Sequence, residues 1–336
     1  MPPLAELPGD DPALADSAAF HAGVIRAAKP VVVRGLGAEL AAVQVAQAGP
    51  EAVLDHLLAY DNGGRPELFL ADPEIGGRYF YREDMAGFNF TRSKVPLAEA
   101  FAHIRRHAAD PGAPTAYLGS MVASAYLPGF AEANRLGVVP PEIETRLWIG
   151  NASHVACHYD SYENLACVIA GSRRFTLYPP DAIGDLYVGP IDNTMAGQPA
   201  SLASADPERF PRFAAARDRA ITVELAPGDA LFLPKLWWHE VEATGPINVM
   251  LNHWWDATAT GPDAPLLSML FAMIAMAERP EAERMAFRAF FDHYVFRPEG
   301  HPLAHLPEDQ RGILRDLTGP AYGQIRAMVL RALRGG

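Results

Sequence analysis

Three residues on two segments of the chain have the types and spacing of metal ligands. His158 and Asp160 are two residues apart, so on a β-strand their imidazole and carboxylate would point to the same face. His239 ends a later aromatic segment, 232–239. If the two segments are neighbouring strands, two imidazoles and one carboxylate would occupy one face of an ion. Non-haem Fe(II) oxygenases use this facial set, because the open positions must take a co-substrate and O₂.

The pair His158 and Asp160 is a common pattern when taken by itself. A histidine and an aspartate at a strand end can also be satisfied by ordinary hydrogen bonds without any ion. The surroundings favour a metal, because the pair opens a β-rich half of the chain and His239 follows a Gly-Asp turn at 228–229. We therefore predict that His158, Asp160 and His239 bind a metal ion.

Residues 1–115 precede this part of the chain and have a mixed α/β pattern. A β-branched run at 31–33 and the aromatic segment 78–81 predict strands. Residues 50–60 begin with proline and have apolar positions at helical spacing, and 96–107 has the same character. We predict an N-terminal α/β flanking region.

Residues 116–258 have the pattern of a β-domain. Short apolar runs are separated by turn residues, which predicts an all-β barrel or sandwich. The runs are 117–121, 146–149, 165–169, 174–178, 220–225, 230–234 and 247–254. A long connection rich in glycine and proline, 181–219, interrupts them, and such a connection in a compact domain is usually a lid or a binding loop.

Residues 259–336 predict a C-terminal helical region. Helical patterns cover 265–278, 280–296 and 325–333. The first is apolar almost all round, and such a helix must be covered on most of its sides. Packing against the barrel and a homodimer interface are two interpretations that this pattern leaves open.

The composition excludes several classes of protein. The chain has 336 residues, 49% of them hydrophobic, and a formal net charge of −12. Because phosphate contacts need a basic surface, general nucleic-acid binding is not expected. Cys157 and Cys167 are the only cysteines, so no disulfide framework is predicted. The acidic N-terminus lacks the pattern of a signal peptide, and the longest apolar run, 265–277, is too short to cross a bilayer. We expect a cytoplasmic protein that does not bind membranes.

A series of ordered motifs carries a family resemblance. The motifs are His158-Tyr-Asp160, Glu163-Asn164, Gly171-Ser-Arg-Arg-Phe175, Tyr178-Pro-Pro180, Glu208-Arg-Phe-Pro211, Pro227-Gly-Asp229 and Trp237-Trp-His239. Over roughly residues 115–256 the chain resembles the cupin-like, JmjC-type Fe(II)/2-oxoglutarate-dependent hydroxylases. That family includes the asparaginyl hydroxylase that inhibits hypoxia-inducible factor and also bacterial cupin-like proteins. The resemblance implies a mainly β fold with helices, a double-stranded β-helix (cupin/JmjC jelly-roll) barrel.

The resemblance also implies roles for single residues. His158, Asp160 and His239 match the iron ligands. Arg173 falls where these hydroxylases place a lysine that pairs with the distal carboxylate of 2-oxoglutarate. Arginine departs from the pattern but suits it chemically, because its planar fork binds a carboxylate bidentately. Arg174 is the alternative partner, although strand alternation favours Arg173.

Three further residues match the co-substrate pocket of the family. Tyr117 matches a tyrosine whose hydroxyl helps to hold the distal carboxylate, and Asn164 and Asn252 match asparagines near the metal-chelating end of the co-substrate. His154 is either a structural histidine or an inward-facing one. Lys235 either lines the barrel mouth, where it would bind an acidic substrate group, or extends to solvent.

The expected activity follows from this resemblance. The chain is predicted to be a 2-oxoglutarate-dependent dioxygenase with Fe(II) that hydroxylates a peptide or protein side chain, or an amino-acid-like small molecule. The substrate class rests on analogy alone. One alternative is a non-catalytic cupin-like binding or regulatory module. Another is a metal cupin enzyme that does not use 2-oxoglutarate.

Overall fold

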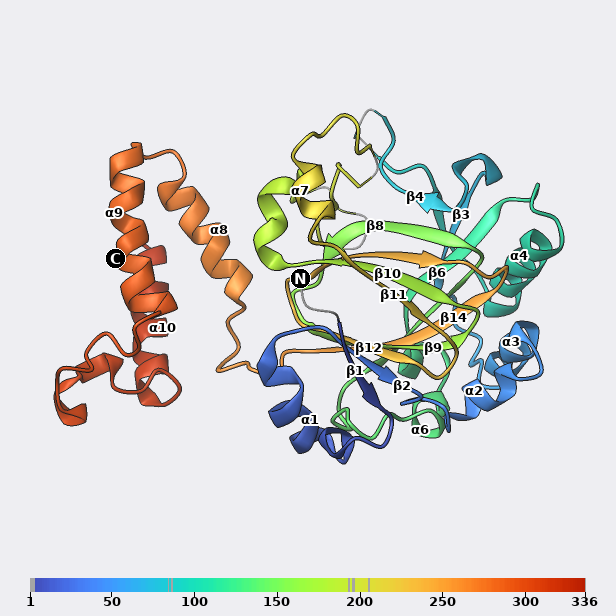
Figure 1. Cartoon of the computed structure of the whole chain (residues 1–336), viewed down its shortest axis with the longest axis horizontal. Coiled ribbons are helices and arrows are strands. Elements are labelled where there is room, and N and C mark those ends of the chain that lie inside the picture. The colour runs from blue at the N-terminus through green and yellow to red at the C-terminus, as the bar shows by residue number, and fades with distance from the viewer. Residues whose placement is uncertain are drawn as a thin grey trace. The chain divides into compact units, whose positions relative to one another are not determined.

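The computed structural model describes residues 4–83, 85, 87–192, 194, 197–204 and 206–335. The chain divides into two compact units, Met1–Ala257 and Thr258–Gly336 (Figure 1). The candidate site lies in the first unit. None of the helices within the described ranges is both long and apolar enough to cross a membrane.

The first unit contains two β-sheets (Figure 1). The nine-stranded sheet has the order β1-β2-β12-β9-β14-β7-β6-β3-β5 and the five-stranded sheet the order β11-β10-β13-β8-β4. The strands are β1 (Ala5–Pro8), β2 (Val31–Arg34), β3 (Glu67–Ala71), β4 (Arg78–Tyr79), β5 (Thr91–Lys94), β6 (Thr115–Val122), β7 (Thr145–Gly150), β8 (Ser153–Tyr159), β9 (Glu163–Ala170), β10 (Arg173–Tyr178), β11 (Ile221–Leu225), β12 (Ala230–Leu233), β13 (Trp238–Ala243) and β14 (Asn248–Trp255). Strands from residues 1–115 thus belong to both sheets.

The two sheets pack face to face through one apolar layer. Val168 and Leu231 of the nine-stranded sheet contact Phe175 and Val241 of the five-stranded sheet within this layer. Such packing of β-sheets over a shared core is the arrangement of β-sandwiches, to which the jelly rolls belong. The prediction of a mainly β, cupin-type fold is confirmed, with helices in addition.

Helices cover the other face of the nine-stranded sheet. They bury Phe20, Leu54 and Phe101 in a core shared with Leu165 of β9. All eight residues of β9 are buried, because this central strand is covered on both faces. The helices of this unit are α1 (Ser17–Gly23), α2 (Ala41–Ala46), α3 (Pro50–Leu58), α4 (Leu97–Ala109), α5 (Ala123–Tyr126), α6 (Phe130–Ala133) and α7 (Phe213–Arg217).

The connection between β10 and β11 contains ordered structure. It begins with a 3₁₀-helix, Pro180–Asp185, and ends with α7. Leu186 and Phe213 of this connection pack with Trp238 of β13 in a separate apolar cluster. Residues 193, 195, 196 and 205 lie outside the described residues. The function of a lid or binding loop stays a prediction.

The second unit is helical. It contains α8 (Pro265–Met276), α9 (Glu281–Phe291), a π-helical turn (Asp292–Phe296) and α10 (Pro320–Leu333). None of these four elements contains a buried residue. α8, which has a single polar side chain, Ser268, leaves Leu267, Phe271 and Ile274 exposed.

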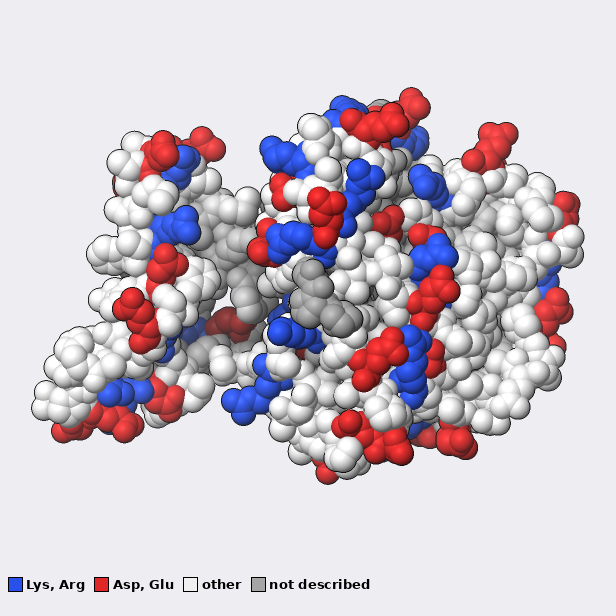
Figure 2. Space-filling model, viewed as in Figure 1, with Lys and Arg blue, Asp and Glu red and all other residues white. Residues whose placement is uncertain are grey.

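The surface mixes both signs of charge. On the face shown in Figure 2, Lys and Arg side chains are interspersed with Asp and Glu. Some of the charged residues form ion pairs, such as Arg34 with Glu6 and Asp229.

Candidate metal centre and co-substrate pocket

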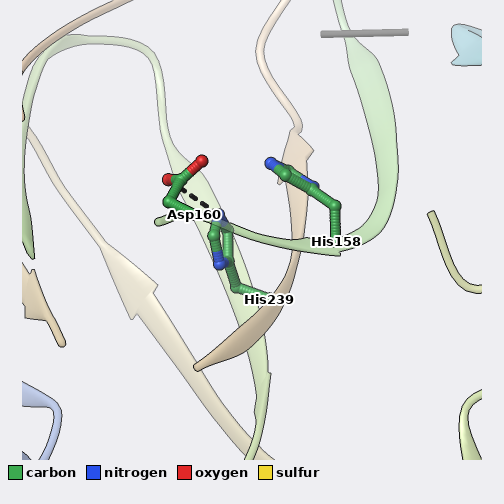
Figure 3. A group of neighbouring side chains, drawn as sticks. All are labelled: His158, Asp160 and His239. Carbon is green, nitrogen blue, oxygen red and sulfur yellow. Dashed lines mark ion pairs between the residues drawn. The ribbon is translucent and has the colours of Figure 1, made fainter. Parts of the chain in front are cut away.

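The structure brings His158, Asp160 and His239 together. β8 and β13 are antiparallel neighbours, and their register places His239 directly opposite His158. The two imidazole ring centroids are 4.3 Å apart. Asp160 follows the last residue of β8, and one ligand atom from each of the three residues lies within 4.8 Å of the others. Figure 3 shows the three side chains converging on one space, so they could hold a single metal ion.

A β-bulge aims His158 at this space. Val155 pairs with Val241 and His158 pairs with His239, so β8 has one more residue than β13 between these pairs. In a regular strand, residues three apart point to opposite faces. The extra residue reverses the alternation. Val155 therefore packs in the inter-sheet core while His158 also faces inward, toward His239.

Hydrogen bonds select the tautomer of both histidines. The Nδ1 atom of His158 lies 2.8 Å from the carbonyl oxygen of Ala156, and that of His239 lies 3.1 Å from the carbonyl oxygen of Trp237. A carbonyl oxygen only accepts, so each Nδ1 carries the hydrogen and each Nε2 keeps its lone pair. Burial, together with the nearby His158, lowers the pKa of His239 to about 4. At neutral pH this imidazole is in the form that binds metals.

Two side-chain donors hold the carboxylate of Asp160. The indole Nε1 of Trp254 donates to Asp160 Oδ2 at 3.1 Å, and Asn164 Nδ2 donates to the same atom at 3.3 Å. The His239 Nε2 atom lies 3.6 Å from it. Hydrogen-bonded carboxylates of this kind are typical of metal centres.

The two predicted asparagines are neighbours in the structure. Asn252 Nδ2 donates to Asn164 Oδ1 at 3.0 Å, and Trp148 Nε1 donates to Asn252 Oδ1 at 2.8 Å. Both asparagines are buried. They therefore link the carboxylate of Asp160 to the wall of the space between the sheets.

Arg173 is a buried cation. Its side chain is 1% exposed, and Nη2 donates to the carbonyl oxygen of Trp148 at 3.4 Å. The buried Nε atom has no hydrogen-bond partner within the described residues. Burial lowers the pKa of Arg173, and the adjacent Tyr117 hydroxyl opposes this effect. Because a buried cation without an anionic partner is costly, this site favours a bound anion.

Arg174 lies on the opposite face of β10. It pairs with Glu224 of β11 at 2.8 Å and with Glu242 of β13 at 3.2 Å. Its side chain is exposed and its charge is already matched by these carboxylates. Of the two arginines, only Arg173 therefore lies in the space between the sheets.

Comparison with known proteins places the chain in a family. The profile described as a cupin-like domain matches residues 17–261, most of the chain. The chain belongs to the cupin-like domain family. Its JmjC-type character, predicted from the motifs, is confirmed by its similarity to curated proteins with JmjC names.

Several relatives of this cupin-like protein have names that describe partners or activities. It is 36% identical over 149 residues to human HSPB1-associated protein 1, which is 42% of this chain and 30% of that protein. It is 33% identical over 120 residues to the Jumonji C domain-containing protein 5 of Drosophila melanogaster, 35% of this chain and 29% of that protein. It is 28% identical over 152 residues to human bifunctional peptidase and (3S)-lysyl hydroxylase JMJD7, 39% of this chain and 46% of that protein. The chain thus matches less than half the length of each of these relatives.

The structure shows the contacts of two residues, His154 and Lys235, for which the sequence left two interpretations open. His154 Nε2 contacts the Glu240 carboxylate, on the face of β13 opposite His239, so His154 does not face inward with His158. Lys235 Nζ lies 2.6 Å from Asp256 Oδ1 and 3.3 Å from Glu163 Oε1. Because two carboxylates already neutralise this lysine, it neither extends freely to solvent nor offers an unmatched charge to an acidic substrate.

Trp148 and Trp254 were missed by the sequence analysis. Their indole groups contact Asn252 and Asp160 respectively. Trp254 is two residues after Asn252 on β14, so alternation alone would have placed both on one face. Trp148 is on β7 and reaches Asn252 across the sheet, a pairing that depends on strand register.

An aromatic segment borders a cavity beside β8. The cavity of about 290 Å³ is lined by Arg78, Tyr79, Phe80 and Tyr81, together with His154, Ala156 and other residues. Ala156 also accepts the hydrogen bond from His158. Because His154 points away from His239, this part of the lining belongs to the outer face of β8.

Proposed function

We propose that the protein is an Fe(II)- and 2-oxoglutarate-dependent oxygenase that hydroxylates a peptide or protein side chain, or an amino-acid-like small molecule. The observation that carries the proposal is the buried Arg173, whose Nε atom has no hydrogen-bond partner among the described residues. It lies in the same inter-sheet space that the three candidate ligands face. Family membership supports it, because relatives carry the names of a lysyl hydroxylase and a lysine-specific demethylase.

The donor set of His158, Asp160 and His239 suits Fe(II). Two neutral imidazoles and one carboxylate on one side of an ion match the facial set of non-haem iron sites. With O₂ and 2-oxoglutarate, Fe(II) would supply the oxidising chemistry. The chain's own residues hold the ligands in position: the backbone carbonyls fix the two imidazoles, and Trp254 and Asn164 fix the carboxylate.

Arg173 and Tyr117 suit the distal carboxylate of 2-oxoglutarate. The guanidinium of Arg173 would bind that carboxylate bidentately, and the Tyr117 hydroxyl beside it would add a donor. Along β10, Arg173 is four residues from Leu177, which pairs with His239. Four residues of strand span about 13 Å, a gap that the arginine side chain and an extended dicarboxylate would fill together. Asn164 and Asn252 would lie toward the metal-chelating end.

Peptide or protein substrates are the first choice. HSPB1-associated protein 1 is named for a protein partner, and JMJD7 for lysyl hydroxylation. An amino-acid-like small molecule is the second choice.

A spectroscopic titration tests this function without knowledge of the substrate. The protein is loaded anaerobically with Fe(II), 2-oxoglutarate is added, and the visible metal-to-ligand charge-transfer band is recorded, with His158→Ala as the control. The proposal predicts a band that the variant lacks. Bound iron without a band would indicate a metal cupin that does not use 2-oxoglutarate, and failure to bind iron would indicate a non-catalytic binding module.

We also propose that the second unit pairs with a second copy of the chain. Five aromatic side chains of this unit are between 41% and 69% exposed: Phe271, Phe287, Phe290, Tyr294 and Phe296. Since each can bury about 150–250 Å², they alone offer on the order of 400–650 Å², and neighbouring leucines and methionines add to this. A standard interface needs about 800 Å² per partner. Residues 258–336 contain nine acidic and nine basic residues, so two such units would not repel each other.

Sedimentation of the full-length protein tests this pairing. We expect a dimer that dissociates in the double variant Phe271→Glu/Ile274→Glu. Ile183→Glu serves as the matched control, because Ile183 is a similarly exposed residue of the first unit. A monomeric wild-type protein, or a dimer unaffected by the double variant, would contradict the proposal.

A further inference from the structure

A series of hydrogen bonds connects Trp148 to the carboxylate of Asp160, and Trp254 donates to the same carboxylate. The series runs from Trp148 Nε1 to Asn252 Oδ1 at 2.8 Å, from Asn252 Nδ2 to Asn164 Oδ1 at 3.0 Å, and from Asn164 Nδ2 to Asp160 Oδ2 at 3.3 Å. Trp254 Nε1 donates to the same Oδ2 atom at 3.1 Å. The carboxylate of Asp160 thus accepts hydrogen bonds from two sides, directly from Trp254 and, through the two asparagines, from the side of Trp148.

Trp148 determines the direction of these hydrogen bonds. An amide side chain can turn either its oxygen or its nitrogen toward a neighbour, whereas an indole N–H can only donate. Asn252 must therefore present its oxygen to Trp148 and its NH₂ group to Asn164. Asn164 must in turn present its own NH₂ group to Asp160. With the opposite orientation, the amide oxygen of Asn164 would face the carboxylate, and two acceptors would meet.

The surroundings leave these groups few other partners. Asn164 and Asn252 are buried, so neither can exchange its partner for bulk water. The rings of Trp148 and Trp254 meet edge to face, with centroids 5.6 Å apart, which keeps both indoles in place. Both donors act on Oδ2 of Asp160, which fixes the orientation of the carboxylate.

We propose that Trp148 and Trp254 are positioning residues that orient the carboxylate of Asp160 for metal binding. Trp254 acts directly and Trp148 acts through the two asparagines. The inference rests on the proposed function, since it requires Asp160 to be a metal ligand. Outer partners of metal ligands contribute about 10- to 100-fold to metal affinity, so both indoles should matter for affinity even though neither touches the ion.

Anaerobic Co(II) titrations of the full-length protein test this role, with the visible absorption of the bound ion as the readout. Trp254→Phe keeps the ring and loses the N–H, and we expect its Kd for Co(II) to rise at least about tenfold. Trp148→Phe should raise the Kd several-fold. Trp255→Phe is the matched control, because Trp255 is the next residue on β14 and packs in the core shared with the helices. Its Kd should equal that of the wild type.

A double-mutant cycle tests whether Trp148 acts through the hydrogen bonds of Asn252 or by an independent effect on packing. Asn252→Asp retains an acceptor for Trp148 but cannot donate to Asn164, so it should weaken Co(II) binding by itself. If Trp148 acts through Asn252, adding Trp148→Phe to this variant should produce little further loss. Equal Kd values for wild type, Trp148→Phe and Trp254→Phe would overturn the inference alone. A wild-type protein that does not bind Co(II) would overturn the metal site and the inference with it.

Discussion

Neighbouring residues of β10 present the same chemical group to the two faces of the five-stranded sheet. On the outer face, Arg174 is held by Glu224 and Glu242. On the inner face, the buried Nε atom of Arg173 has no hydrogen-bond partner within the described ranges. The outer arginine is matched by the protein itself, whereas the inner one is the arginine that we propose binds the 2-oxoglutarate carboxylate.

The two histidines of β8 show the same difference between the outer and inner faces of the sheet. His154 on the outer face contacts Glu240, whereas His158 on the inner face uses Nδ1 for a backbone carbonyl and directs its other nitrogen toward the candidate metal site. A group that is already satisfied contributes to the fold. A group that is held in place with a free ligating atom is suited to bind a ligand.

The largest expected effect should distinguish the two histidines of β8. His158→Ala should weaken Fe(II) binding by more than about 100-fold, beyond what outer partners of metal ligands contribute. His154→Ala should leave it nearly unchanged, because His154 lies on the other face. Anaerobic isothermal titration calorimetry measures both. An equal loss of Fe(II) affinity in the two variants would contradict the assignment of the metal site to the inner face of β8.

The two arginines of β10 should differ in their effect on 2-oxoglutarate binding. Arg173→Met removes charge-assisted hydrogen bonds, so the Kd for 2-oxoglutarate should rise by roughly 30- to 1,000-fold, or about 2–4 kcal/mol. Arg173→Lys should retain part of the affinity, because it keeps the charge but not the planar fork. Arg174→Met is the matched control and should bind normally. Titration of Mn(II)-loaded protein gives the three values, and a defect in Arg174→Met alone would reverse the assignment.

The buried His239 should make the stability of the metal-free protein depend on pH. Its pKa is about 4 in the folded chain against about 6.5 when unfolded. Between these values the unfolded state binds the extra proton, so the free energy of unfolding falls as the pH is lowered from 6.5 to 4, by about 3 kcal/mol in total. Burial also lowers the pKa of His253 to about 4. This histidine should therefore contribute a similar pH dependence to the free energy of unfolding.

Urea unfolding at several pH values checks this effect. His239→Asn should lose about half of the pH dependence, since His253 remains. A profile identical to that of the wild type would show that His239 is not buried in its neutral form.

The last expected effect concerns stability without ligands. Arg173→Met should make the metal-free protein more stable by about 1–4 kcal/mol, because replacing a costly buried charge with an apolar side chain is often favourable. Arg174→Met should not stabilise it. Thermal unfolding measures both, and Mn(II) with 2-oxoglutarate should raise the Tm of the wild type more than that of Arg173→Met. A destabilised Arg173→Met protein would indicate that the protein itself already satisfies this cation.

Local patterns in the sequence predicted a large part of this architecture. The period-2 alternation of β10 was enough to separate Arg173 from Arg174. The run of apolar residues around 165–169 predicted a strand, which the structure extends to Glu163–Ala170 and buries on both faces. The mainly β, cupin-type fold followed from such runs and from the ordered motifs.

Features that depend on long-range pairing could not be predicted in this way. The bulge in β8 reverses the alternation between His154 and His158, so counting residues placed both on one face. The contact of Trp148 with Asn252 requires the register of β7 and β14. The partners of Lys235 lie at the start of β9 and just after β14, and nothing near Lys235 in the sequence points to them.

A crystal structure of the protein with Mn(II) and 2-oxoglutarate, grown without O₂, tests the comparison of the two faces most directly. The account predicts the ion on His158 Nε2, His239 Nε2 and a carboxylate oxygen of Asp160, with the distal carboxylate of 2-oxoglutarate on Arg173 and Tyr117. Arg174 should keep its pairs with Glu224 and Glu242. A co-substrate bound on the outer face, or an ion bound without any anion at Arg173, would contradict the account.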